Sequence, residues 1–321
     1  MAADFGIFVP QGWRMDLVEI EDPFEQYEAM TWGAKVADET GAYDSIWVYD
    51  HFHTVPDPTM NSVFEAWTAC AGLARDTENV KIGQMVTCNG YRNPALLAKI
   101  ASTVDVMSNG RLLCGIGAGW YEHEWLAYGY GFPEVPVRMR MLKEACEIVH
   151  RMFAEDSPTF DGEFYHIDRP INEPKGVSKP HPPLWIGGGE KVTLKLVARW
   201  GDACNFGNGD VEIIKRKLEV LRGHCENEGR NYEEITRSTS INVYLLEEGE
   251  DPEEATKEHR GSKSYEEYSQ EFMVGTSEEI VERLHPMVEA GVEYFITYLP
   301  RVACDPTPVE RFAREVIPKV G

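Results

Sequence analysis

The sequence predicts an α/β protein of the (β/α)8 TIM-barrel class. Apolar, β-rich runs recur along the 321 residues, and segments with helical periodicity separate them. The runs are continuously apolar, which is typical of parallel strands that are covered on both faces. A chain of this length is also usual for one barrel of this class. We therefore expect a single domain over residues 1–321.

Eight apolar runs supply the expected strands. They are residues 5–10, 45–50, 81–87, 111–117, 183–188, 202–207, 239–246 and 294–299. A doubly wound sheet is the alternative, and it would normally show a glycine-rich fingerprint after its first strand. The first run reads FGIFVPQGW, which is not such a fingerprint. Eight βα pairs in one chain favour the closed barrel.

Three intervening helices have clear boundary signals. After the third strand, Asn93 is a capping residue, Pro94 suits the first helical position, and an Asn-Gly pair ends the helix. Residues 138–153 have similar periodicity. So do residues 278–290, which are entered through a Thr-Ser pair and left at a glycine.

Three longer segments interrupt the alternation, at about 120–137, 154–182 and 247–275. We expect them to be insertions in the βα loops of the barrel. The middle segment is rich in Pro and Gly, which predicts an ordered lid or edge insertion. The third segment is highly charged, which predicts an exposed helix.

The composition excludes several classes of function. A formal net charge of -23 repels nucleic acid and anionic lipid, so an anionic ligand would need a local pocket of amides or cations. There is no apolar run of 18 residues and no basic leader before an apolar stretch. The seven cysteines are odd in number and form no Cys-x-x-Cys pair, which indicates reduced thiols. We expect a cytoplasmic protein that contacts neither nucleic acid nor membrane.

The second expected strand ends in Asp50, His51 and His53 without a turn residue before them. In a barrel, the carboxyl ends of the strands form the active-site rim. A metal site is one interpretation, because two histidines in a His-x-His pair can share a metal ion. It is disfavoured because the ends of strands four to six offer no further histidine ligand. A solvated strand end is the other alternative, and it fits His53 better than the Asp50-His51 pair.

Glycines gather at the ends of two other strands. Strand four ends with Gly117, Ala118 and Gly119, where a flat ring could approach the backbone, although a tight turn would also use glycine. Strand five ends with Gly187–Gly189 and opens a helix near Lys191. Free N–H groups at such a helix start are suited to phosphate, which predicts a phosphate-binding loop there.

Together these residues resemble the luciferase-like flavin monooxygenase superfamily, and within it the branch that uses the deazaflavin coenzyme F420. The resemblance covers nearly the whole chain. It rests on DHF at 50–52, MVTCNGYRNPALLAKIASTVDVMSNGRL at 85–112, GIGAGW at 115–120, PLWIGGGEKVTLKLVARWGDACN at 183–205 and GTSEEIVERLHPMVEAGVEYF at 275–295.

The resemblance implies a cofactor site. In the family, the third strand often carries a bulge with a non-proline cis peptide that supports the flavin, and here that bond would join Met85 and Val86. Thr87 and Asn89 would follow at the edge of the cofactor. The loop at Gly187–Gly189 would hold the phosphate of F420 or, as the alternative, of FMN.

The resemblance also implies catalytic roles. Asp50-His51 matches the pair of deazaflavin-dependent sugar-phosphate dehydrogenases, in which the histidine acts as a base. Asp50 would lie near either the cofactor or the His51 ring. Those enzymes carry an acid where this chain has Trp120, so Trp120 and Tyr121 would form an aromatic wall for a less polar substrate. Glu122 and Glu124 could replace the missing acid, although solvated loop acids are the commoner case. Trp13 and His53 are further candidates for the wall.

Four functions follow in order of preference. The first is an F420-dependent oxidoreductase that transfers a hydride to or from C5 of the deazaflavin, with His51 as acid/base. The second is an FMN-dependent monooxygenase that uses O2 and a separate flavin reductase. A non-catalytic flavin-binding barrel and a metal hydrolase come last. We expect a small-molecule substrate, no metal and, from the family, a homodimer.

Overall fold

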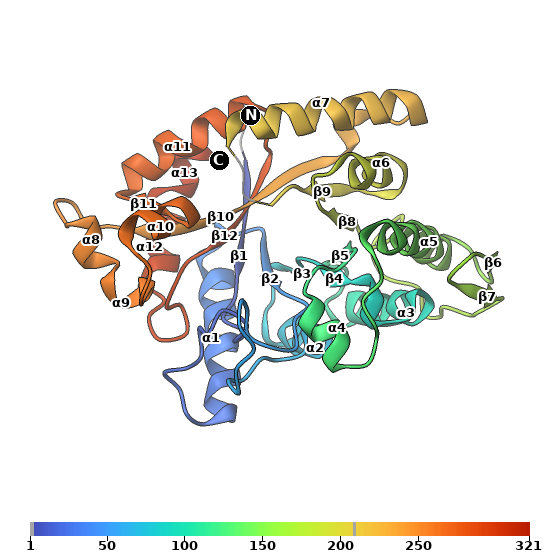
Figure 1. Cartoon of the computed structure of the whole chain (residues 1–321), viewed down its shortest axis with the longest axis horizontal. Coiled ribbons are helices and arrows are strands. Elements are labelled where there is room, and N and C mark those ends of the chain that lie inside the picture. Colours follow the sequence, from blue (N-terminus) through green and yellow to red (C-terminus); the bar gives the residue numbers. More distant parts are fainter. Residues whose placement is uncertain (1–2, 208–209) are drawn as a thin grey trace.

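Eight parallel strand positions form a closed barrel in the computed structural model, which describes residues 3–207 and 210–321 (Figure 1). In order around the barrel the strands are β1 (Asp4–Phe8), β2 (Ser45–Val48), β3 (Lys81–Gln84) continued by β4 (Thr87–Cys88), β5 (Leu112–Gly117), β8 (Leu184–Gly187), β9 (Ala203–Asn205), β10 (Thr236–Leu245) and β12 (Tyr294–Tyr298). Pairing of β12 with β1 closes the barrel. The predicted fold class is confirmed, and each expected strand is found within a few residues of its predicted place.

Helices surround the barrel in the predicted alternation. They are α1 (Pro23–Thr40), α2 (Ala66–Asp76), α3 (Pro94–Met107), α5 (Val135–Ala154), α6 (Lys191–Trp200), α7 (Val211–Glu228), α11 (Ser277–Glu289), α12 (Thr307–Glu315) and α13 (Ile317–Val320). Short 3-10 turns are η1 (Asn89–Tyr91) and η2 (Tyr232–Glu234). The Asn93 side chain caps α3, as predicted, and Thr276 forms a capping box with Glu279 at the start of α11.

The barrel interior is packed around Trp47, whose indole is fully buried. Its ring fits because the neighbouring strands carry Gly6 and Gly83, where a Cβ atom would overlap the indole. A second apolar layer lies between the strands and the helices. This packing holds the strand ends rigidly, which is what a site built on them needs.

Two of the three insertions lie in βα loops, as predicted. Residues 120–137 connect β5 to α5 and contain the short helix α4 (Glu122–Ala127). Residues 247–275 follow β10 and contain α8 (Pro252–Ala255), α9 (Lys257–Arg260), α10 (Tyr265–Glu271) and the strand β11 (Met273–Gly275). The expected single helix is therefore wrong. Gly261 has a φ of 55° and Ser264 starts a new capped helix, so the helical path is broken there.

The third insertion differs from the prediction. Residues 154–182 connect the end of α5 to β8, so they form a helix-to-strand connection and not a βα loop. They contain a hairpin of β6 (Thr159–Asp161) and β7 (His166–Asp168), which projects at the right of Figure 1. Glu144 of α5 fixes the hairpin by accepting backbone N–H bonds from residues 163–165. The Pro- and Gly-rich composition predicted an ordered insertion, but it did not indicate the end of the barrel on which the insertion lies.

Two further findings concern the predictions from composition. No helix among the described residues is long and apolar enough to cross a membrane. All seven cysteines are free thiols, and only Cys304 is exposed.

Candidate active site

His51 lies at the carboxyl end of β2 and pairs with an acid from another strand end. Its Nδ1 is 3.0 Å from Oε2 of Glu124, which belongs to α4 in the loop after β5. The His51 side chain is 10% exposed and that of Glu124 is 0% exposed. Among the described residues, Nε2 of His51 has no hydrogen-bond partner, so this atom is free to act on a ligand.

Glu124 is held by three further hydrogen bonds. Its Oε1 accepts the backbone N–H groups of Phe52 and His53 at 2.6 and 2.8 Å, and its Oε2 accepts the Tyr91 hydroxyl at 2.8 Å. Burial raises the pKa of this carboxyl, but the bonds from His51, His53 and Tyr91 outweigh burial and lower the pKa below its usual value. Glu124 is therefore an anion at neutral pH and requires the proton of His51 to lie on Nδ1.

Glu124→Gln is expected to lower the free energy of unfolding by about 2–3 kcal/mol at pH 7, because a neutral amide cannot accept all four bonds. A carboxyl whose pKa is lowered by folding stabilises the protein above its unfolded pKa of about 4.5 and loses this effect as the pH falls through its folded pKa. Urea unfolding at several pH values measures both effects. The difference between wild type and variant should shrink below pH 4.5. A constant difference would contradict the assigned charge.

Three of the residues predicted to form an aromatic wall lie around the His51 ring. The Trp13 ring stacks on it with centroids 4.8 Å apart and planes at 14°. Trp120 and Tyr121 meet it edge-on at 5.6 and 5.8 Å. Trp13 is buried, whereas Trp120 is 61% exposed. His53 lies further out, with its Nδ1 3.2 Å from Nδ1 of His123.

Among the described residues, no hydrogen bond joins the Asp50 carboxylate to the His51 ring, so the expected place of Asp50 beside this ring is wrong. Both carboxylate oxygens bond to Arg92, at 2.6 and 2.9 Å, and one also accepts the Cys88 N–H at 2.8 Å. Arg92 also pairs with Glu65. Asp50 therefore ties the end of β2 to the two residues that flank η1, Cys88 and Arg92. Glu124 takes the place beside the imidazole.

The bulge in the third strand lies where the resemblance placed it. The peptide bond between Met85 and Val86 is cis and separates β3 from β4. A Cβ atom on Gly117 or Gly187 would lie 2.6 or 2.8 Å from the Val86 side chain. These two glycines therefore serve close packing of three adjacent strands against the bulge. Gly119 has a φ of 74°, and its carbonyl accepts a bond from Arg138.

The other predicted residues of the third and fourth strands have mixed outcomes. Thr87 is fully buried and its hydroxyl accepts the indole N–H of Trp67 on α2 at 3.1 Å, so it faces a helix. Asn89 donates to the Tyr165 hydroxyl at 3.1 Å, while its buried Oδ1 has no partner among the described residues. Ala118 is half-buried between the two glycines.

The glycine loop has the features of a phosphate site. Gly188 has a φ of 124°, and its N–H donates a hydrogen bond to the Asn205 carbonyl at 2.9 Å. No described side chain caps α6, which begins at Lys191, so its first N–H groups are available to an anion. A Cβ atom on Gly189 would lie 2.5 Å from Nζ of Lys217, so an ammonium group lies beside the loop. The predicted Lys191 side chain is exposed.

The phosphate group of F420 or FMN fits this loop. The uncapped helix start supplies N–H donors, and the lack of a side chain at Gly189 leaves room for the Lys217 side chain, which supplies a positive charge. The nitrogen of Lys217 also donates to Phe206 O at 3.2 Å, which holds it in place. Lys217 belongs to α7 and was not predicted from the sequence.

Arg14, in the loop after β1, is a second residue that the sequence did not reveal. Its guanidinium lies 4.2 Å from the ring of Tyr298 and 5.0 Å from the ring of Trp13. It donates one bond to Asn242 at 3.0 Å, and no described carboxylate pairs with it. A cation therefore lies beside the aromatic wall.

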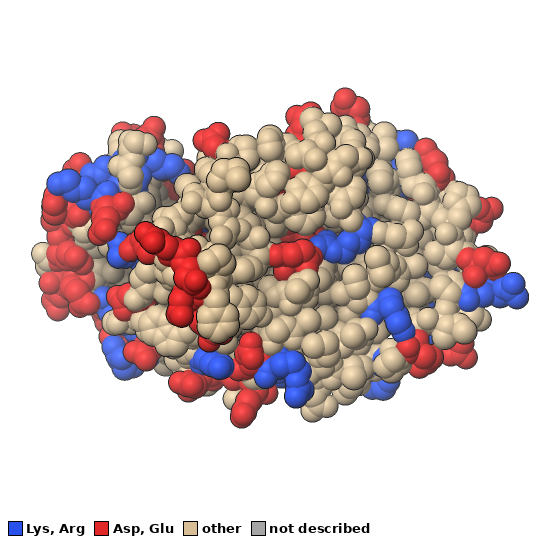
Figure 2. Space-filling view, turned by 90° about the horizontal axis from the view of Figure 1, so that it is seen from below, with Lys and Arg blue, Asp and Glu red and all other residues tan. Residues whose placement is uncertain are grey.

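Charge is unevenly distributed on the face seen in Figure 2. Much of the middle of this face is uncharged, and charged side chains gather at its left end, where α8 and α9 lie in Figure 1. Within the described part of the chain, no group of three or more His, Cys, Asp or Glu side chains is arranged to hold a metal ion.

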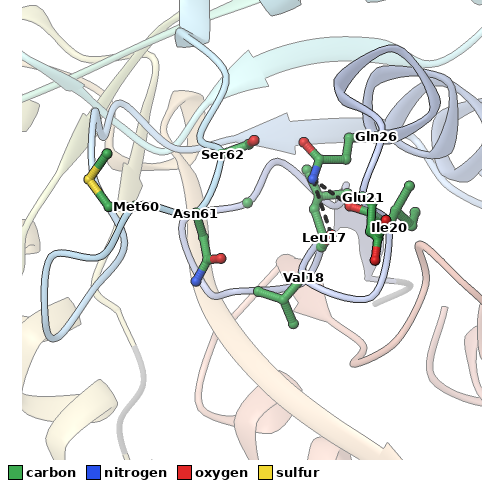
Figure 3. A pocket seen from close by; sticks show the side chains of 9 residues that line it. Leu17, Val18, Ile20, Glu21, Gln26, Met60, Asn61 and Ser62 are labelled. Carbon is green, nitrogen blue, oxygen red and sulfur yellow. Dashed lines mark hydrogen bonds between the residues drawn. The ribbon is translucent and has the colours of Figure 1, made fainter.

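A separate cavity of about 280 Å³ lies between the loops after β1 and β2 (Figure 3). Gln26 lines it and donates to the Ile20 carbonyl at 2.7 Å, while its own Oε1 has no partner among the described residues. None of the predicted site residues lines this cavity. It is therefore distinct from the His51 site.

Comparison with known proteins agrees with this geometry. The family model described as luciferase-like monooxygenase matches residues 3–269. An F420-dependent glucose-6-phosphate dehydrogenase of Kineococcus radiotolerans is 32% identical over 237 residues, which cover 70% of this chain and 65% of that protein. The chain thus spans slightly less than two thirds of that relative. An FMNH(2)-dependent dimethylsulfone monooxygenase of Pseudomonas putida is 26% identical, with 80% and 78% covered.

Solved structures share the fold. An F420-dependent secondary alcohol dehydrogenase, in complex with an F420-acetone adduct, has a TM-score of 0.80 at 23% identity, and the match covers all of both chains. The oxygenating constituent of 3,6-diketocamphane monooxygenase from Pseudomonas putida, in complex with FMN, has a TM-score of 0.79 at 16% identity, with 100% and 99% covered. These likenesses establish a shared barrel.

Proposed function

This chain belongs to the luciferase-like monooxygenase family, and from that premise we propose that it is a coenzyme F420-dependent oxidoreductase with His51 as its acid/base. The observation that carries the proposal is the buried pair of His51 and Glu124 inside an aromatic wall. The relatives that depend on F420 support the choice of cofactor. When bound, F420 would supply or accept a hydride at C5 of its ring.

The residues of the site have separate tasks in this proposal. Glu124 accepts the Nδ1 proton of the imidazole, so Nε2 of His51 is the atom that takes a proton from a substrate hydroxyl or returns one to a carbonyl oxygen. Trp13 covers one face of the imidazole and excludes water from it. Within the described part of the chain, Arg14 pairs with no carboxylate, so an anionic group on the substrate would bind there.

A bound cofactor would divide the carboxyl ends of the strands into two halves, one for its phosphate and one for its ring. Gly189, Lys217 and the first turn of α6 would hold the phosphate, and the bulge at Met85 and Val86 would support the ring. Asp50 and Arg92 stabilise the chain that follows the bulge. The substrate would then lie between the ring and His51.

The alternative is an FMN-dependent monooxygenase that uses O2 and a separate flavin reductase. The relatives and neighbours that use FMN favour it, because the same loop would hold the phosphate of either cofactor. Titration of the purified protein with F420 and with FMN, followed by fluorescence, decides between them. We expect F420 to bind with a micromolar or lower Kd and FMN at least tenfold more weakly. Tighter binding of FMN would favour the alternative, and binding of neither would refute both.

A further inference from the structure

A groove of about 510 Å³ lies on the outer wall of the barrel between α5 and α6. Its lining combines an apolar floor with a basic rim. The floor consists of Val135, Pro136, Met139, Val192 and Leu196, and the rim consists of Arg140, Lys143, Lys195 and Arg199. Val135 and Val192 are each 57% exposed, so the floor is open to a ligand.

The cations of the rim are largely unneutralised. Arg140 pairs with Glu163 at 3.2 Å. Within the described part of the chain, Lys143, Lys195 and Arg199 have no carboxylate within 4.0 Å. Lys195 and Arg199 also lie four residues apart on α6, a spacing at which like charges repel. In a chain of net charge -23, this concentration of unpaired cations favours an anionic ligand.

The groove begins beside the glycine loop. Val192 is the second residue of α6 and follows Gly189 by three positions. Both α5 and α6 follow barrel strands in the chain, so they start at the face of the barrel that carries the carboxyl ends of the strands and run away from that face. From Val192 to Arg199 the helix rises about 10 Å. A chain that leaves the phosphate site can therefore enter the groove over the first turn of α6.

We propose that the groove binds the acidic tail of F420. This inference rests on the proposed function. F420 continues beyond its phosphate into a chain of γ-linked glutamates, whereas FMN ends at its phosphate. The tail alternates carboxylates with methylene groups, which match the basic rim and the apolar floor in turn. Lys143, Lys195 and Arg199 bind the carboxylates, and Val192 and Leu196 contact the methylene groups.

The test compares two forms of F420, one with a long glutamate tail and one with no glutamate. Their Kd values are measured by fluorescence titration of the purified protein at low and at high salt. We expect the long-tailed form to bind about tenfold more tightly than the form without glutamate at low salt. This difference in Kd should shrink at high salt. In the double variant K195E/R199E the advantage should disappear, while the affinity for the form without glutamate stays within about twofold.

Lys35→Glu is the matched control, because Lys35 is an exposed lysine on α1, away from the groove, and no carboxylate of the described residues pairs with it. It should retain the advantage of the long tail. Two results would overturn the proposal that the groove binds the tail and leave the proposed function standing. One is an equal Kd of both forms for the wild type, and the other is tighter binding of the long-tailed form that K195E/R199E retains. If neither form of F420 binds, both the proposed tail-binding role of the groove and the proposed function are overturned.

Discussion

His51→Gln is expected to lower kcat about a thousandfold while F420 still binds with nearly unchanged Kd. A positioned acid/base contributes roughly 10² to 10⁴ in rate, and a thousandfold loss corresponds to about 4 kcal/mol of transition-state stabilisation. The amide of Gln can occupy the space between Trp13 and Glu124, but it cannot exchange a proton near neutral pH. The measurement is the rate of absorbance change of F420 with a substrate found by screening, together with a fluorescence titration of the cofactor.

His53→Gln is the matched control for this prediction. His53 also follows β2, but its imidazole pairs with His123 and does not contact Glu124. We expect kcat to change less than threefold. The pH profile of kcat should keep its imidazole limb in His53→Gln and lose it in His51→Gln. A His51→Gln enzyme with a third or more of the wild-type kcat would refute the assignment of His51 as acid/base.

Sequence analysis predicted the parts of the site that are formed by residues close together in the sequence. Strand ends are visible as apolar runs that stop at polar residues, which located His51 after β2. The glycines at 187–189 directly precede a predicted helix, so neighbouring residues in the sequence were enough to predict a phosphate-binding loop. The bulge at Met85 and Val86 came from the resemblance, because an ordinary buried strand has the same composition.

The partners of these residues could not be predicted, because they come from distant parts of the chain. Glu124 lies 73 positions from His51, and in the sequence it is one of two acids at the start of a short helix. Glu122 is exposed and Glu124 is buried, a difference that the packing of α4 on the end of β2 creates. Arg92 lies 42 positions from Asp50, and their pairing likewise requires the closed barrel.

Gly189→Ala is expected to weaken F420 binding roughly 10- to 100-fold without unfolding the protein. The new Cβ atom would lie 2.5 Å from Nζ of Lys217, and the long lysine side chain can move away where backbone could not. The displaced ammonium would then no longer face the phosphate. A hydrogen bond to a charged group contributes roughly 1.5–3 kcal/mol, and each 1.4 kcal/mol is about tenfold in Kd.

Lys217→Met should give a similar loss, because it removes the same charge and leaves the loop backbone unchanged. Gly223→Ala is the matched control, since its Cβ atom on α7 would meet nothing within 4 Å, and it should leave Kd within about twofold. In the double variant of Gly189→Ala and Lys217→Met, the two effects should not add, because both act through one ammonium. Additive losses would show that Gly189 acts on the cofactor directly, and wild-type affinity in Lys217→Met would remove Lys217 from the phosphate site.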